Sequence, residues 1–216
     1  WEAVAGADWF KTAQALAEEQ DLFHWKLEFP EAFYEKDGAL QNKDGFSAVI
    51  GNPPWMDFQR IDETSRKFQR SHFRSAKGKY DLYAVFVERG LELVTERGEF
   101  GYTIQNKFLS SDYGKALKQF TIENTNVRNL LDFEDAPIFG GTTTYPLILT
   151  TTGTQQDTFQ YVHLRDATER DVVECLRDVD SMSATIERDS LNADSPWIFP
   201  THEKKTVIES LRHALR

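Results

Sequence analysis

The tetrapeptide Asn52-Pro53-Pro54-Trp55 has the residue types needed to hold and activate a planar amine. Asn52 offers a side-chain carbonyl, and the amide that joins it to Pro53 offers a second carbonyl. The two prolines fix φ and remove two backbone donors, so the turn would present acceptors. Trp55 adds a flat face on which a ring could stack. An NH₂ group held by two acceptors keeps its lone pair out of ring conjugation, ready to attack a methyl group.

The same four residues have a second interpretation, as a rigid turn that closes a strand and places Trp55 in the core. The preceding run, residues 46–51, is short and mostly apolar. It predicts a buried β-strand, because such runs are typical of strands that end at turn residues. This strand context favours the chemical interpretation of the turn.

The composition is that of a globular chain with an aromatic-rich core. Of 216 residues, 40% are hydrophobic, including 16 Phe and 5 Trp, which suits one domain or one and a half. The single cysteine, Cys175, excludes a disulfide framework and a multi-cysteine zinc site, and it fits a reducing cytoplasm. The 5 histidines show no metal-ligand spacing, so no metal site is expected. The sequence begins at Trp1 inside a helical pattern, and we expect it to be a fragment of a longer protein.

The charge is unevenly distributed along the chain. The net charge of −10 argues against general nucleic-acid affinity. Residues 57–79, directly after the turn, nevertheless hold seven basic residues against three acidic ones. Such a segment could contact phosphates, and its alternative is a solvated helix face and loop. The candidate phosphate ligands are Arg66, Lys67, Arg70, Arg74, Lys77 and Lys79.

Hydrophobic periodicity predicts strands that alternate with helices up to residue 153 and a change of pattern after it. This order favours an α/β fold with a mostly parallel sheet and an antiparallel last strand, followed by a short α+β segment. We therefore expect two parts, 1–153 and 154–216. The predicted strands are 46–51, 100–104, 127–133, 145–150 and 158–164. The predicted helices are 8–20, 61–69, 80–96, 112–122, 167–177 with Asp166 as its N-cap, and 202–215.

Several single residues have chemical and structural alternatives. Asn106 and Lys107 follow a predicted strand, where sites gather in open α/β sheets, and they could line a pocket. Asp81 and Tyr83 could border a ligand, although an Asp at a helix start is also favoured by the helix dipole. Glu88, Glu92 and Glu96 recur at i, i+4 spacing, which predicts a solvated helix face.

Six segments, taken in order, resemble γ-class DNA adenine-N6 methyltransferases of the single-chain restriction–modification and phage-defence type. The resemblance touches the chain from about residue 23 to its end, and it is more specific than the tetrapeptide alone. Trp55 replaces the commoner Tyr or Phe of that family and keeps the stacking surface. The segments are 23–33, 46–55, 79–94, 98–109, 135–149 and 195–199.

The resemblance implies a Rossmann-like sheet, S-adenosylmethionine as cofactor, and double-stranded DNA as partner. Asn52 and the Pro53 carbonyl would hold the amine of a flipped adenine, and Trp55 and Phe139 would sandwich the purine. The family holds its cofactor on a Gly-rich loop that precedes the catalytic turn, and none appears between Trp1 and Gly51. The resemblance therefore implies that 1–153 is the second half of the catalytic domain, inactive alone. Residues 154–216 would lead to a target-recognition domain.

Two other functions remain open from the sequence. RNA and protein-glutamine methyltransferases share the Asn-Pro-Pro-aromatic turn. A non-catalytic interaction module could also keep the fold without the cofactor half. A Gly-rich loop upstream of Trp1 would favour the enzyme over such a module.

Overall fold

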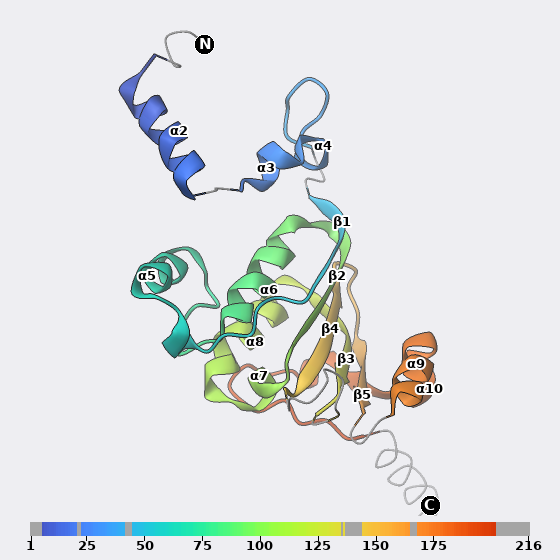
Figure 1. The fold of residues 1–216 in the computed structure, drawn as a ribbon. Helices are drawn as coiled ribbons and strands as arrows, with labels where there is room; N and C mark the ends of the chain where they lie inside the picture. The colour runs from blue at the N-terminus through green and yellow to red at the C-terminus, as the bar shows by residue number, and fades with distance from the viewer. Residues whose placement is uncertain are drawn as a thin grey trace, which may run out of the picture. The chain divides into compact units, whose positions relative to one another are not determined.

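The computed structural model describes residues 6–20, 23–41, 45–134, 136, 144–164 and 168–201 (Figure 1). The chain divides into two compact units, 1–44 and 45–216. The first contains α2 (Asp8–Gln20), which confirms the predicted helix, and two short helices, α3 (Trp25–Glu28) and α4 (Pro30–Phe33). Pro30 begins α4, where its fixed φ suits the first helical turn and its missing N–H costs nothing.

The second unit is built on one mixed sheet with the strand order β1-β2-β4-β3-β5-β6. β1 runs parallel to β2, whereas β4 runs antiparallel to both of its neighbours, β2 and β3. This arrangement confirms the predicted α/β sheet, in which β4 is the antiparallel strand predicted at 145–150. The strands are β1 (Phe46–Gly51), β2 (Val94–Gln105), β3 (Asn126–Asp132), β4 (Pro146–Thr152), β5 (Thr158–His163) and β6 (Ala184–Glu187).

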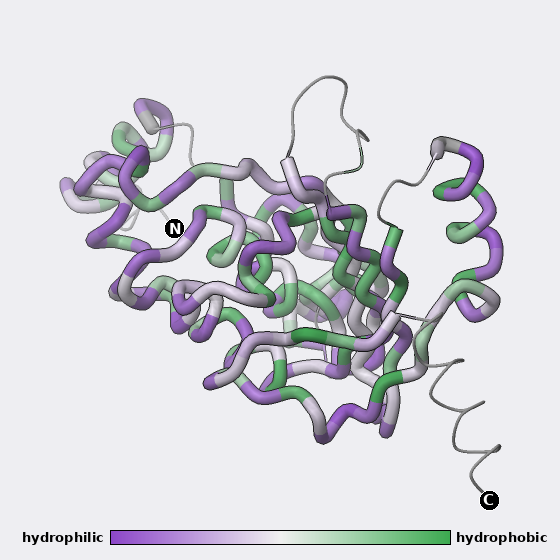
Figure 2. Tube along the Cα trace, turned by 90° about the horizontal axis from the view of Figure 1, so that it is seen from below, coloured by the Kyte–Doolittle hydropathy of each residue, from purple (hydrophilic) through white to green (hydrophobic). Residues whose placement is uncertain are grey.

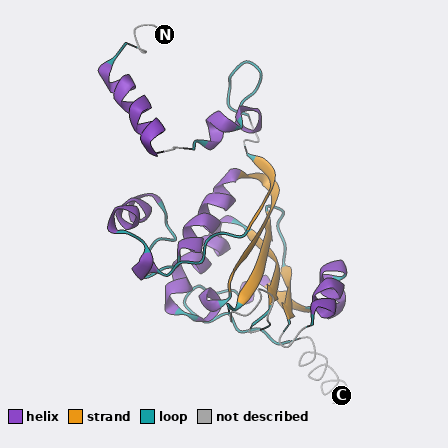
Figure 3. Ribbon diagram, in the orientation of Figure 1, coloured by secondary structure: helices purple, strands orange, loops and turns teal. Residues whose placement is uncertain are grey.

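Helices cover the sheet on both faces (Figures 1 and 3). The helices of this unit are α5 (Glu63–His72), α6 (Leu82–Leu93), α7 (Lys107–Ser110), α8 (Lys115–Asn124), α9 (Glu169–Arg177) and α10 (Val179–Met182). α6 and α8 pack on one face, and α9 and α10 lie against the other. In the described part of the chain, no helix combines the length and apolarity that crossing a bilayer requires.

The alternation of side chains along β3 divides the core into two clusters. Leu130 is 0% exposed and faces α6 and α8, together with Ile104 and Leu147. Leu131, the next residue, is 2% exposed and faces α9, where it packs near Cys175. Consecutive strand residues point to opposite faces, so β3 is buried on both sides. Figure 2 shows hydrophobic residues gathered in the interior of this unit.

Three sequence-based expectations need correction. β1 has its predicted bounds, but it is an edge strand rather than a buried one, and Ile50 is 86% exposed. The helix predicted to reach Glu96 ends at Leu93, because Val94 already pairs with Phe46 as part of β2. Thr168 caps α9 through a reciprocal capping box with Asp171, so the N-cap predicted at Asp166 is wrong.

The segment after Gly153 continues the same sheet. β5 pairs in parallel with β3, and β6, which the sequence did not reveal, pairs antiparallel with β5. The expected division into 1–153 and 154–216 remains a proposal about the organisation of the larger protein. The predicted final helix, 202–215, lies outside the described residues.

Gly114 lets a short 3-10 turn (Asp112–Gly114) pack directly on α7. A Cβ added at Gly114 would lie 2.1 Å from the carbonyl oxygen of Phe108, whereas one added at Gly101 would lie 3.6 Å from Thr150 Cγ2. We expect Gly114→Ala to lower the free energy of unfolding by about 1–3 kcal/mol, because backbone must move. Gly101→Ala, the control, should change it little. Thermal unfolding checks both, and equal losses would contradict this account.

Candidate functional site

The turn Asn52–Trp55 lies at the carboxyl end of β1. Gly51 pairs with Tyr102 of β2, and the indole Nε1 of Trp55 donates to the carbonyl of Thr103 at 3.3 Å. Trp55 is half-buried and packs against the main core, Pro53 is buried, and Asn52 and Pro54 are exposed. Among the described residues, the Asn52 side chain has no hydrogen-bond partner. Its amide oxygen is therefore available to a ligand.

The chain that leaves the turn is fixed to the start of α6. The backbone N–H of Leu82 donates to the carbonyl of Met56 at 2.9 Å, and Asp57 forms an antiparallel bridge with Asp81. Phe58 packs edge-on against Tyr80, with ring centroids 5.4 Å apart. The turn is thus held from both sides, by β2 and by α6, so its acceptors have a defined position.

A cavity of about 250 Å³ lies beside this anchored segment. It is lined by Asp57, Phe58, Gln59, Lys79, Tyr80, Asp81 and Tyr113. Asp81 is 5% exposed, and burial together with the Asp57 carboxyl raises its pKa to about 6. The Tyr113 hydroxyl and Lys107 act in the opposite direction on the pKa of Asp81. Asp81 makes no side-chain cap to α6, so its role is not that of an ordinary helix-capping residue.

A polar cluster lies at the carboxyl ends of β2 and β3, on the same side of the sheet as the turn. The Asn106 amide donates to Asp132 Oδ1 at 2.8 Å, and the Tyr161 hydroxyl donates to Asp132 Oδ2 at 3.4 Å. His163 Nε2 lies 2.8 Å from Glu134 Oε1. Burial raises the pKa of Asp132. This cluster lines a cavity of about 390 Å³ with Trp197 and Phe199 among its walls, and the turn residues are not among them.

Asn106 and Lys107, which were both expected to line a pocket, have different surroundings in the structure. Asn106 does line a cavity, but its amide is bonded to Asp132, and Lys107 beside it is exposed. Sequence reasoning did not single out Asp132, although its place at the end of a predicted strand was an available signal. Phe139 lies outside the described residues, so its expected place beside the purine stays a prediction.

The basic segment folds as α5 and a loop that returns to α6. The guanidinium groups of Arg66 and Arg70 lie 4.9 and 4.8 Å from the Phe58 ring centroid. Lys67 pairs with Glu63 at 2.8 Å. Arg74 pairs with Glu123. Lys77 and Lys79 are exposed, and neither forms an ion pair with another described residue.

A buried carboxylate secures the loop after α5. Glu88 is 1% exposed and accepts hydrogen bonds from the backbone N–H groups of Arg74 at 2.8 Å and Ser75 at 2.7 Å. The solvated face predicted for this glutamate is therefore wrong. The helix pattern alone could not reveal that a loop from 13 to 14 residues upstream covers it.

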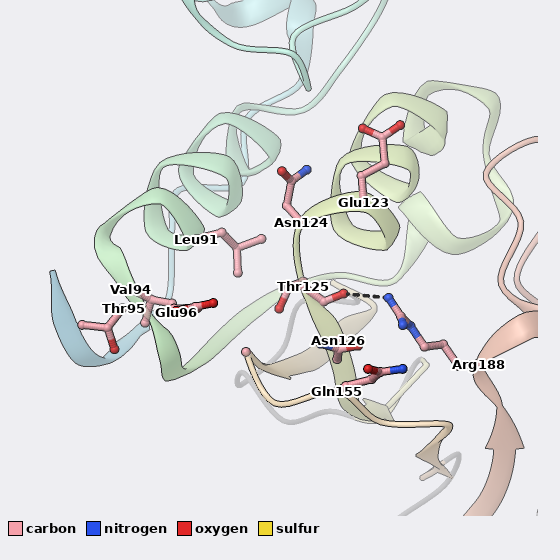
Figure 4. Close-up of a pocket in the computed structure, with 11 residues that line it drawn as sticks. Leu91, Val94, Thr95, Glu96, Glu123, Asn124, Thr125, Asn126, Gln155 and Arg188 are labelled. Atoms are coloured by element: carbon pink, nitrogen blue, oxygen red, sulfur yellow. Dashed lines mark hydrogen bonds between the residues drawn. The ribbon is translucent and has the colours of Figure 1, made fainter. Parts of the chain in front are cut away.

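A third cavity, of about 370 Å³, lies at the opposite edge of the sheet, where β3 begins and β4 ends (Figure 4). Arg188 reaches across it and donates to the carbonyl of Thr125 at 3.5 Å. None of the expected site residues lines it. Within the described residues, no group of three or more His, Cys, Asp or Glu side chains could hold a metal ion.

Comparison with known proteins decides the family. The family model described as "Eco57I restriction-modification methylase" matches residues 5–139. The chain belongs to this family. Its relatives include the type II restriction enzyme and methyltransferase RM.Eco57I of Escherichia coli, 29% identical over 74% of this chain and 16% of the relative. The type II methyltransferase M.BstVI of Geobacillus stearothermophilus is 25% identical over 78% of this chain and 32% of its own length.

Solved structures show the same fold at low sequence identity. The type IIG restriction endonuclease BpuSI matches 78% of this chain and 21% of its own, with a TM-score of 0.58 and 15% identity. A nuclease-deletion mutant of the type ISP restriction–modification enzyme LlaGI, solved with a DNA substrate mimic, matches 72% of this chain and 15% of its own. Its TM-score is 0.55 at 17% identity. Together with the family model, these matches confirm the restriction–modification methyltransferase resemblance. The chain spans only a third or less of these proteins.

The Asp57–Asp81 pair predicts a pH dependence of stability. Because the folded state raises the pKa of Asp81 from 3.8 to about 6, the folded chain binds more protons than the unfolded chain in that interval. The contribution of Asp81 to stability should therefore fall as the pH rises from 3.8 through about 6. Asp81→Asn removes the charge and keeps the shape, so it should flatten this slope and be more stable than the wild type at pH 8.

Thermal unfolding between pH 4 and pH 8 measures the effect, with the exposed Asp189→Asn as the matched control. The control should follow the wild-type slope. An Asp81→Asn protein that is less stable than the wild type at pH 8 would show that Lys107 and Tyr113 more than compensate the charge of Asp81.

Proposed function

We propose that this chain is part of a cytoplasmic restriction–modification or phage-defence enzyme that methylates N6 of adenine in double-stranded DNA, with S-adenosylmethionine as methyl donor. The observation that carries the proposal is the unpartnered Asn52 amide, exposed at the carboxyl end of β1 in a turn held by β2 and α6. Membership of the Eco57I family supports the methyl-transfer chemistry.

The turn would act by holding the reacting amine. The side-chain carbonyl of Asn52 and the Pro53 carbonyl would each accept one N–H of the adenine amine, which keeps its lone pair directed at the methyl group. Trp55 would stack on the purine, with its indole fixed by the bond to Thr103. Phe139 would cover the other face. A duplex hides N6, so the adenine must be flipped out before it can enter this site. The gain in rate would come from position and electrostatics.

The turn residues would border only the reacting end of the cofactor. S-adenosylmethionine would supply an electrophilic methyl group, and Asn52 and Pro54 are exposed on the turn that would hold the amine. The described residues before β1 include no Gly-rich loop that could hold the rest of the cofactor. We therefore propose that the cofactor-binding half belongs to another part of the enzyme, and that the isolated chain is inactive.

The basic segment supplies the proposed contacts to DNA phosphates. Lys77 and Lys79 are exposed and free of ion pairs with other described residues. Arg66 and Arg70 are held over Phe58, which fixes their positions on α5. Lys67 and Arg74 would exchange their partners, Glu63 and Glu123, for phosphates. Charge neutralisation of this kind makes the affinity depend strongly on salt.

Replacing Asn52 tests the proposed catalytic role. In the full-length enzyme, Asn52→Ala should lower single-turnover methylation on the order of 10²-fold or more, because one preorganised acceptor is lost. The affinity for DNA should stay within about 2-fold, since phosphate contacts dominate it. Gln155→Ala, exposed at the opposite edge of the sheet, is the control and should keep full activity. Undiminished methylation by Asn52→Ala would rule out the assigned role.

Titration with the cofactor tests the fragment proposal. Without a Gly-rich loop, the 216-residue chain should bind S-adenosylmethionine more weakly than a Kd of ~10 μM, or about −7 kcal/mol. Isothermal titration calorimetry measures this, with the full-length enzyme as the positive control. Tighter binding by the chain alone would show that its own residues form the cofactor site.

A further inference from the structure

Tyr145 is an exposed aromatic residue in a strained backbone conformation, directly before β4. Its φ is +50°, in the left-handed region, which is unfavourable for a bulky L side chain. The side chain is 39% exposed, and its hydroxyl has no hydrogen-bond partner among the described residues. Glycine would adopt this conformation without strain. The backbone alone therefore does not require a tyrosine at this position.

Glu134 is the other described non-glycine residue with a positive φ, +45°, and its side chain has a structural use. Its backbone N–H donates to Asp132 Oδ1 at 3.0 Å, and its carboxylate lies 2.8 Å from His163 Nε2. Tyr145 is held through its backbone instead, because its carbonyl accepts from the Asn106 N–H at 2.9 Å. Its hydroxyl thus has a fixed point of attachment and no structural use within the described chain.

Strand β2 supports both Tyr145 and the turn. The Trp55 indole donates to the carbonyl of Thr103, and the carbonyl of Tyr145 accepts from Asn106, three residues farther along the chain. β1 and β4 lie on opposite sides of β2. Strand spacing and rise then place the Cα atoms of Asn52 and Tyr145 roughly 14 Å apart at the same end of the sheet. A purine base and a tyrosine side chain together span such a gap.

The proposed site offers acceptors to the amine of adenine, and the purine ring needs a donor. The carbonyls of Asn52 and Pro53 would both accept from the amine, whereas the unsubstituted ring nitrogens of adenine are acceptors themselves. The indole N–H of Trp55 is already bonded to Thr103. A phenol O–H is a donor, and the Tyr145 hydroxyl is available for this bond.

We propose that Tyr145 is a specificity-determining residue whose hydroxyl donates a hydrogen bond to a ring nitrogen of the extruded adenine. This inference rests on the proposed DNA methylation and adds to it a contact that reads the ring, separate from the amine held by Asn52. Strained residues persist where the surrounding structure holds them, and the bond from Asn106 does so here. A site that hydrogen-bonds a substrate group discriminates strongly against analogues that lack the group.

The test removes one oxygen atom in the full-length enzyme. Tyr145→Phe keeps the ring and the backbone conformation, and kcat/KM for methylation of a duplex with the target adenine should fall about 5- to 10-fold, the scale of one neutral hydrogen bond. Its unfolding temperature should match that of the wild type, because the lost hydroxyl has no described partner. The control is Tyr34→Phe, which removes a hydroxyl in the first unit that also has no described partner. It should keep both values.

Three modified duplexes locate the bond on the purine. In each of them the target adenine carries C–H in place of one ring nitrogen, N1, N3 or N7, so that one acceptor is missing. On one of the three, the wild type should lose as much kcat/KM as Tyr145→Phe loses on adenine. On that duplex the wild type and Tyr145→Phe should no longer differ, because the donor has lost its acceptor.

Four outcomes would overturn the inference. Tyr145→Phe with the wild-type kcat/KM on adenine would show that the hydroxyl makes no contact that matters, while methylation by the wild type leaves the proposed function standing. A difference between wild type and variant that persists on all three modified duplexes would show that the hydroxyl does not bind the ring. A lowered unfolding temperature of Tyr145→Phe would assign the hydroxyl to folding. Failure of the wild type to methylate the adenine duplex would contradict the proposed function itself, and the inference with it.

Discussion

Strand β4 must pair on both sides at once, and the arrangement of the second unit depends on this constraint. Leu149 of β4 is opposite Tyr102 of β2 on one side and Leu130 of β3 on the other. Because the last strand of the four returns to the middle, the carboxyl ends of β2 and β3 meet at its start. That meeting brings Asn106 within hydrogen-bond distance of Asp132. β3 is covered by helices on both faces, so its side chains contribute to both hydrophobic clusters.

Asn106 and Asn52 both lie at the carboxyl ends of strands, but their side chains have different surroundings and therefore different roles. The Asn106 amide donates a hydrogen bond to the buried carboxylate of Asp132. This bond stabilises the carboxylate, because an unpaired buried charge is costly. Asn52 keeps its amide free, because the turn is held through the Trp55 indole and the backbone of Met56 instead. The anchoring groups and the free acceptor are thus different atoms, and a ligand can take the acceptor without loosening the turn.

Local patterns predicted the elements well and long-range partners poorly. The bounds of β1 and α2 follow from short apolar runs and helix-forming residues, which need no knowledge of the rest of the chain. The end of α6 at Leu93 could not be predicted in this way, because it is set by the pairing of Val94 with Phe46, which is far away in sequence. Glu88 was misplaced for a similar reason, since its partners are backbone groups of a loop. At the site, the Asn-Pro-Pro-Trp motif indicated the turn and the distribution of charge indicated the basic segment. Neither the Asp57–Asp81 contact nor the hydrogen bond between Asn106 and Asp132 has a local signal.

The edge position of β1 links the pairing of this strand to the position of Asn52. Asn52 continues a strand that is bonded to β2 on one side only within the described sheet, and Ile50 beside it is open to solvent. Edge strands readily accept another strand, because their backbone groups are already aligned for it. Any strand that does so would stiffen the backbone from which Asn52 projects. The rigidity of the acceptor would then depend on the added strand as well as on β2.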